Sequence, residues 1–431
     1  MNIRHIITAT ALTLSAVAAD ASTWSLDSCI SYAREHNLTV RSRQLDRQGA
    51  ELSVTEARDR YLPSLSASAS ESFSFGRGLT SENTYANRNT QSFNWGVNMT
   101  LPLFQGLSAW RQEKYARASL AAVVEDVEAA KDDVTLNVMA AYLQVLYARE
   151  IYEVALETQN LSKIELKRRQ DLFEAGKIAE LDVTEARSQL AQDELSAVNA
   201  DNDWKLALLD LTQLLRLPDP ENFDVAPLRD EEAFIGDPDE VYKRALENNH
   251  TLAASRLRID AAKRQVDVAR SGYLPTLSFN LGLGSTYYKL NGEQNPSFTR
   301  QMRDNYSTGL GFSLNIPIFD AFSTRNNVRR ARLEETTAKL NYETSCDNIY
   351  KDIQQAYYRA VAAEKKLSSS KIARDSSHDA FLAMQEKYNY GRANATEYEQ
   401  AKSAYVRAVA ENVQARYELI MRGRILAFYN R

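Results

Sequence analysis

Four short segments of the chain alternate between apolar and polar residues, and they fall into two pairs. In the first segment every second residue from 65 to 75 is apolar apart from Glu71, and serine fills the positions between. The segment from Phe93 to Leu101 has the same period. A period of two predicts strands with one apolar and one polar face. The polar loop from Gly76 to Ser92 joins the two strands as a hairpin.

The second pair repeats this pattern later in the chain. Apolar residues alternate with Ser, Asn and Gly from Leu277 to Gly284 and again from Tyr306 to Ile316, around a polar loop at 289–305. The strands of the first hairpin are about ten residues long, which suits a tilted strand crossing a bilayer. A hairpin of a soluble β-sandwich is the alternative. Two matching hairpins favour the membrane interpretation.

Long helices separate the strands. The stretch from Leu107 to Glu174 contains neither proline nor glycine, and a helix of that length is roughly 100 Å long at 1.5 Å per residue. Apolar residues recur in it every seven positions, as in a coiled coil. They include Leu120, Val127, Val134, Ala141, Ala148 and Ala155. Helices this long do not fit a compact globule, so we expect them to pack side by side.

The two halves of the chain match each other at a nearly constant offset. The matched segments are 61–65 with 273–277, 101–104 with 316–319, and Gly176 with Gly391. The offset is 212 residues for the first match and 215 for the other two. Each half therefore carries helix, strand, strand, long helix, turn and helix, which indicates an internal duplication.

Composition and the first residues place the chain outside the cytoplasm. An apolar stretch from Ile6 to Ala19 follows Arg4 and ends in small residues, which predicts a signal peptide over 1–21. The net charge of −5 does not favour a nucleic-acid partner, and the mean hydropathy of −0.45 excludes a helical membrane bundle. The two cysteines, Cys29 and Cys346, are interpreted as unpaired, although an exported protein permits a disulfide.

Four membrane strands per chain are too few to close a barrel. An open sheet edge in lipid leaves unpaired N–H and C=O groups that cost several kcal/mol each. Two copies would give eight strands, whose interior side chains fill, and the small Ser, Gly and Asn residues are poor fillers. We therefore expect a homotrimer with a twelve-stranded barrel around a wet lumen. The fold class is mainly α, with an α-helical tube continuous with a transmembrane β-barrel.

This chain resembles the TolC-type outer-membrane factor family in its signal peptide, its duplicated halves, its Tyr-Leu-Pro strand entries and its glycine turns. The resemblance implies a trimeric duct that works with a periplasmic adaptor and an inner-membrane pump of RND or ABC type. The implied organisation, in chain order, is a signal peptide at 1–21, a periplasmic helix at 22–62, a hairpin at 63–104, a long helical pair at 105–217 with its tip at 174–181, a connector at 218–238, a second periplasmic helix at 239–274, a second hairpin at 275–319 and a second helical pair at 320–431 with its tip at 389–396.

The two tips are the candidate sites. The resemblance implies adaptor docking there, with the edges formed by Gly176, Lys177, Ile178 and Leu181 and by Gly391, Arg392 and Ala393. It also implies a periplasmic gate. The family's acidic ring falls on Glu397 and Gln400, and the second of these lacks the acid. Asp182, near the first tip, is also a candidate residue of this gate. The alternative is that both tips are ordinary turns with solvated flanks.

The family also pairs a tyrosine with an arginine near this turn to hold the entrance shut. Tyr388 matches the tyrosine, but Ala393 occupies the usual arginine position, and Arg392 lies one residue earlier. Nothing in the sequence suggests an enzyme, a metal site or a cofactor, and the three histidines beyond the signal peptide are expected to be solvated. The function implied is passive export for efflux. The alternatives are the outer-membrane component of type I protein secretion and, less favoured, a trimeric coiled-coil scaffold or adhesin.

Overall fold

The computed structural model describes residues 23–79, 83–217, 223–228 and 233–431. The expected signal peptide at 1–21 lies outside the described residues, as do parts of the connector at 218–238. The chain divides into two compact units. Unit 1 comprises residues up to Arg41, 131–241 and 353–431, and unit 2 comprises 42–130 and 242–352.

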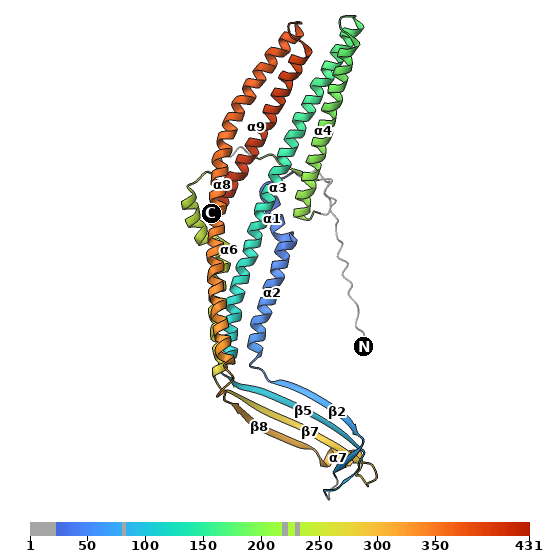
Figure 1. The fold of residues 1–431 in the computed structure, drawn as a ribbon, viewed down its shortest axis with the longest axis vertical. Helices are drawn as coiled ribbons and strands as arrows, with labels where there is room; N and C mark the ends of the chain where they lie inside the picture. Colours follow the sequence, from blue (N-terminus) through green and yellow to red (C-terminus); the bar gives the residue numbers. More distant parts are fainter. Residues whose placement is uncertain (1–22, 80–82, 218–222, 229–232) are drawn as a thin grey trace, which may run out of the picture. The chain divides into compact units, whose positions relative to one another are not determined.

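Unit 1 contains two long helical hairpins, and each turns back on itself through a short tip (Figure 1). The first joins α3 (Ser108–Glu174) to α4 (Glu180–Leu215), and the second joins α8 (Ser323–Asn389) to α9 (Ala395–Tyr429). Helices α3 and α8 begin in unit 2 and end in unit 1. Helices of 67 residues confirm the expectation of long, side-by-side helices.

The core of unit 1 joins the start of the chain to the first hairpin. Helix α1 (Leu26–His36) packs its buried face on α3 and α4, and a short parallel pairing of β1 (Thr23–Trp24) with β6 (Asp224–Val225) lies beside it. The valines of the sevenfold repeat contribute the apolar surface on α3. Val134 of that repeat is nearly fully buried, and Val138 and Val145, which are seven residues apart on a neighbouring line of α3, are fully buried.

Two buried polar side chains organise this core. The hydroxyl of Tyr142 lies 3.0 Å from the carbonyl oxygen of Trp24 and 2.5 Å from that of Ala226, on either side of the β1–β6 pairing. Asn37 interrupts the helix expected over 22–62, and α2 (Leu38–Asp59) starts directly after it. The Asn37 amide donates to the carbonyl of Leu214, which ties this break to the end of α4.

Unit 2 contains an antiparallel sheet of four strands in the order β2-β5-β7-β8, visible in Figure 1. Their bounds are β2 Ser64–Ser74, β5 Thr90–Gln105, β7 Thr276–Leu290 and β8 Ser307–Asn315. The pairing of β5 with β7 joins the two hairpins, which the sequence did not indicate. The register aligns Leu65 with Met99, Met99 with Leu281 and Leu281 with Leu310, so the apolar rows share one face.

The loops depart from the expected hairpins in three places. Strand β5 continues through Pro102 to Gln105, with an irregularity in its pairing to β7 between Pro102 and Phe104. Proline is accommodated inside a paired strand only where its missing N–H is tolerated, and a bulge is such a place. The first loop holds a small pair of strands, β3 (Arg77–Leu79) and β4 (Tyr85–Asn87). The second holds a short helix, α7 (Phe298–Asp304).

Helix α7 covers part of an exposed edge of the sheet. Strand β8 pairs with β7 only as far as Gly284, so the later backbone groups of β7 need other partners. The Gln301 side chain bonds both the N–H and the C=O of Tyr288, at 3.0 and 2.9 Å. Asn305 donates to the carbonyl of Thr286 at 2.6 Å. Side-chain amides thus replace the missing strand.

Helices α5 (Pro238–Asn248) and α6 (His250–Arg270), followed by a 3-10 turn at Ser271–Tyr273, lead back to the sheet. In unit 2, His250 bonds Glu125 at 2.8 Å and Arg258 bonds Asp126 at 2.5 Å, which fastens α6 to α3. His250 was expected to be solvated; its side chain is 38% exposed, and Glu125 is a partner that the expectation did not include. Among the described helices, none has the length and the apolar composition needed to cross a bilayer.

Candidate functional site at the helical tips

The first tip is a glycine turn closed by a capping aspartate. Gly176 has φ +68°, a left-handed conformation that strains residues with a Cβ. The N–H of Lys177 bonds the carbonyl of Leu172 at 2.9 Å, which satisfies an otherwise orphan group at the end of α3. The Asp182 carboxylate accepts from the backbone N–H of Ala179 at 3.0 Å. Asp182, predicted for the gate, therefore caps the start of α4.

The second tip has the same construction. Gly391 has φ +70°, and the N–H of Arg392 bonds the carbonyl of Lys387 at 2.8 Å. Asn394 and Glu397 form a reciprocal capping box, in which each side chain accepts from the backbone N–H of the other, at 2.8 and 2.9 Å. The carboxylate of Glu397, expected in a ring, is engaged at the start of α9.

The hairpins of unit 1 meet through Tyr388 of α8. Its hydroxyl donates a 2.5 Å hydrogen bond to Glu165 of α3. Glu165 is buried and also accepts a 2.8 Å charge-assisted hydrogen bond from Arg169, one turn along α3. The ring of Tyr388 stacks on Tyr398 of α9, with the two centroids 4.9 Å apart. One tyrosine therefore contacts both its own hairpin and the neighbouring one.

The arginine partner of Tyr388 is not the one considered from the sequence. Arg392 is exposed, whereas the guanidinium of Arg168 lies 4.5 Å from the centre of the Tyr388 ring. Arg168 also donates to the side-chain oxygen of Asn389 at 2.7 Å and to the carbonyl of Tyr388 at 3.3 Å. Sequence reasoning missed Glu165, Arg168 and Arg169. The signal was available as a glutamate followed three and four residues later by arginines, a spacing that pairs charges on a helix.

Burial keeps the tyrosines of this site neutral. It raises the pKa of Tyr398 to about 12, with a smaller contribution from the charge of Glu165. Burial also raises the pKa of Tyr388, and its hydrogen bond to Glu165 acts in the same direction. Tyr388 is therefore a hydrogen-bond donor to a carboxylate throughout the neutral range.

The remaining predicted residues lie on the outer surface of the tips. Lys177, Arg392 and Gln400 are exposed, and Ile178 and Ala393 are half-buried. Leu181 is 67% exposed. Tyr390, which the sequence analysis did not single out, is 79% exposed beside Gly391. Large apolar side chains left open at both tips are typical of a contact surface.

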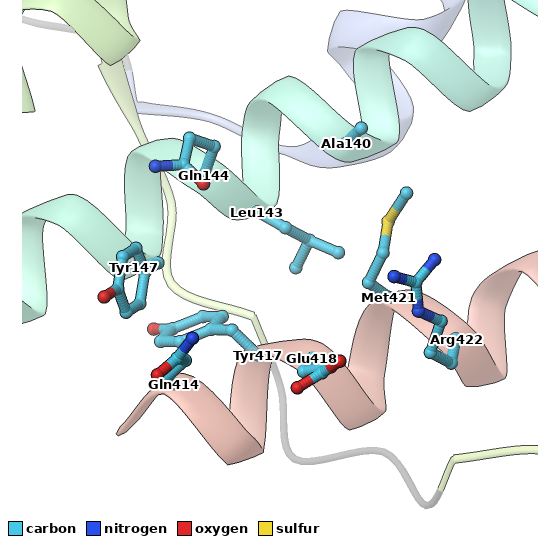
Figure 2. Close-up of a pocket in the computed structure, with 9 residues that line it drawn as sticks. All are labelled: Ala140, Leu143, Gln144, Tyr147, Gln414, Tyr417, Glu418, Met421 and Arg422. Atoms are coloured by element: carbon cyan, nitrogen blue, oxygen red, sulfur yellow. The ribbon is translucent and has the colours of Figure 1, made fainter. Parts of the chain in front are cut away.

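A hollow lies between α3 and α9 in unit 1 (Figure 2). Tyr147 and Tyr417 contact at one end, with ring centroids 6.3 Å apart, and Met421 and Arg422 lie at the other. The remaining lining residues are Ala140, Leu143, Gln144, Gln414 and Glu418. The residues that line the hollow do not pair a nucleophile with a general base. The hollow is therefore better explained by the packing of α3 on α9 than by a catalytic site.

The described residues contain no group of three or more His, Cys, Asp or Glu side chains placed to hold a metal ion. Cys29 and Cys346 are free thiols. Cys29 is fully buried, and that burial raises the pKa of its thiol to about 12. A buried thiol of this kind is a packing residue rather than a nucleophile.

A family model described as outer membrane efflux protein matches residues 29–215 and 241–423. The chain is 26% identical over 405 residues to the outer membrane protein TolC of Escherichia coli K12, covering 90% of this chain and 78% of that protein. It is 23% identical over 348 residues to the alkaline protease secretion protein AprF of Pseudomonas aeruginosa, covering 79% and 70%. The structure of the CmeC outer membrane channel of Campylobacter jejuni aligns at a TM-score of 0.76 and 18% identity, covering 100% of this chain and 94% of that one.

Proposed function

Because the chain belongs to the outer membrane efflux protein family, we propose that three copies of it form a passive duct through the outer membrane. The observation that best supports this proposal is the four-stranded sheet, whose outer strands β2 and β8 each pair on one side only. In lipid those free edges would be costly, so strands of neighbouring copies must complete them. Twelve strands enclose a lumen wider than side chains alone can fill.

The two faces of the sheet support this assembly. Leu65, Leu310 and Phe312 are all more than two-thirds exposed in the single chain, and the strand register puts them on one face. An apolar row of this kind suits lipid, while the Ser, Gly and Asn residues of the opposite face suit water. The polar face therefore lines the duct.

The duct is the outer-membrane component of an export system. We propose that a periplasmic adaptor docks on the exposed tip residues, including Leu181 and Tyr390, and that an inner-membrane pump supplies the cargo and the energy. A lumen lined with small polar groups discriminates weakly, so the pump selects the cargo. Efflux is the leading role, and the likeness to a protease secretion protein keeps protein export as the second. Neither role requires an enzyme, a metal or a cofactor of this chain.

The contact between Tyr388 and Glu165 is the proposed closure of the periplasmic end. It joins the two hairpins near their tips. Glu165 is buried, so its carboxylate depends on the hydrogen bonds that Tyr388 and Arg169 donate. Moving α8 away from α3 removes one of those donors. The gate thus has a closed state stabilised by hydrogen bonds to a desolvated charge.

The decisive experiment combines oligomeric mass with ion conductance. The protein purified from outer membranes in detergent is expected to have the mass of three chains and to give discrete currents in planar bilayers. A protein that stays a single chain, dissolves without detergent and gives no current would refute the duct. As a control, the mass is measured again on protein pulled down with an antibody from cells that lack the adaptor. A trimer there would show that the chain assembles without its partner.

A further inference from the structure

A buried lysine joins the two helical hairpins of unit 1. Lys402 of α9 is 1% exposed, so its ammonium group is removed from water. Its Nζ atom lies 2.7 Å from the hydroxyl of Ser162 on α3 and 3.3 Å from Oδ2 of Asp193 on α4. It also pairs with Glu399, three residues earlier on α9, at 2.9 Å. The charge of one hairpin is thus inserted between the two helices of the other.

The first hairpin is prepared to receive this charge. Ser162 donates a 2.5 Å hydrogen bond to Oδ2 of Asp193, so α3 and α4 already share the acceptor that Lys402 uses. Gln189 donates to the other carboxylate oxygen at 3.0 Å. These contacts hold the side chains of Ser162 and Asp193 in place around the acceptor that Lys402 uses.

Separation of the hairpins at this point is unfavourable. If the hairpins part, the ammonium group of Lys402 and the carboxylate of Asp193 lose their mutual attraction, while the neighbouring helices still shield both groups from water. A purely apolar contact between long helices could slide by a turn. A buried ion pair specifies a single register, and a polar residue in a helical interface has this role in coiled coils.

The duplicated half of the chain lacks the same cluster. At the offset of 215 residues, Lys402 corresponds to Arg187, which is exposed, and Asp193 corresponds to Ala408. The buried charge is therefore not a general feature of these hairpins. It belongs to one seam, between α9 and the α3/α4 hairpin of the same chain.

We propose that Lys402 is a latch between the hairpins, and that the periplasmic entrance opens only when its ammonium group leaves Ser162 and Asp193. This inference rests on the proposed duct function. It adds a gating residue deeper in the helical seam than the Tyr388–Glu165 contact, on the opposite helix of the second hairpin. Three such latches would hold a trimer shut.

The test measures distance and conductance on the same variants. Spin labels are attached at Gln192→Cys of α4 and Ser403→Cys of α9, both exposed positions, with Cys29→Ala and Cys346→Ser in the background. Labelled chains are diluted with unlabelled ones so that distances within one chain dominate. Lys402→Met is expected to broaden the distance distribution and to raise the conductance several-fold.

Two further variants protect the interpretation. Lys402→Met with Asp193→Asn and Glu399→Gln removes the ammonium group and both carboxylates that it meets, so a folding defect from an orphan carboxylate cannot be mistaken for latch release. Arg187→Met removes a charge at the matching position of the other half and is expected to behave like the unsubstituted protein in both measurements. The latch is overturned if both Lys402 variants keep a narrow distance distribution. It is equally overturned if they conduct no more than a conducting parent protein. If the parent itself forms no channel, the duct proposal fails, and the distance distribution alone decides whether Lys402 joins the hairpins.

Discussion

Asp182 and Glu397 occupy the same position in the two tips, 215 residues apart, and each carboxylate accepts a hydrogen bond from the backbone N–H three residues before it. The duplication has therefore kept an acid at the third residue of both returning helices. This position closes the helix start, and it also places negative charge near the positive end of the helix dipole.

Glu397 caps the start of α9 and is also the predicted ring carboxylate, and two substitutions separate these roles. Glu397→Ala is expected to destabilise the start of α9 by about 1 kcal/mol and to speed hydrogen exchange there. Glu397→Gln keeps a capping side chain and loses only the charge. If three carboxylates form a ring, the Gln variant conducts cations less selectively while its exchange rates stay unchanged. Equal cation selectivity in both variants and the parent would remove Glu397 from the gate.

Tyr388→Phe is expected to raise the conductance of the closed duct. The substitution preserves the ring and its stacking on Tyr398 but removes the donor to Glu165, a bond to a charged group worth about 1.5–3 kcal/mol. Single-channel recording checks the result. Tyr390→Phe serves as the control because Tyr390 is exposed at the same tip. Equal currents in the two variants would show that the Tyr388 hydroxyl does not hold the entrance.

Alkaline pH is expected to loosen the second tip through Tyr398. Its pKa in the folded protein, about 12, lies above the ordinary value of 10, so the folded state holds the phenol proton more tightly. The associated stability is complete below about pH 10 and is lost as the pH rises toward 12. Unfolding measured at several pH values should show a smaller decline for Tyr398→Phe. Tyr358→Phe, at an exposed position of α8, should decline like the parent.

The two faces of β8 offer a matched test of membrane insertion. Leu310 lies on the apolar face and Ser313 on the polar face of the same strand, and both are exposed in the single chain. Leu310→Arg is expected to cost about 2–4 kcal/mol if it meets the bilayer centre. It should therefore reduce the amount of trimer in outer membranes. Ser313→Arg should insert normally and alter the current. The reverse outcome would show that the Ser313 face meets lipid and the Leu310 face lines the duct.

Gln301→Ala is expected to destabilise the end of β7. The variant leaves both backbone groups of Tyr288 without the amide that bonds them. Because these groups are only partly buried, the loss should stay below the about 1–3 kcal/mol that a fully buried unsatisfied group costs. Limited proteolysis of the loop at 289–305 measures the effect. Arg303→Ala, on the exposed side of α7, is the control and should leave the cleavage rate unchanged. Protection of the loop in both variants would contradict the role given to Gln301.

Periodicity within the chain determined most of the architecture. The period of two located the strands and their apolar face, the sevenfold repeat located the buried valines of α3, and the constant offset revealed the duplication. The glycines located both tips, since Gly176 and Gly391 take the left-handed conformation that other residues avoid. These features depend on neighbours a few residues apart, and the sequence records such neighbours directly.

Only the tertiary structure decided which polar groups meet. Tyr388 and Glu165 are 223 residues apart, and Lys402 and Ser162 are 240 apart. The same holds for the pairing of β5 with β7, and for the use of Gln301 as a substitute strand partner. Charged residues on long helices look alike in sequence whether they face water or a neighbouring helix. Their roles follow from the packing and register of distant segments, because those decide which charges are removed from water and which partners they then require.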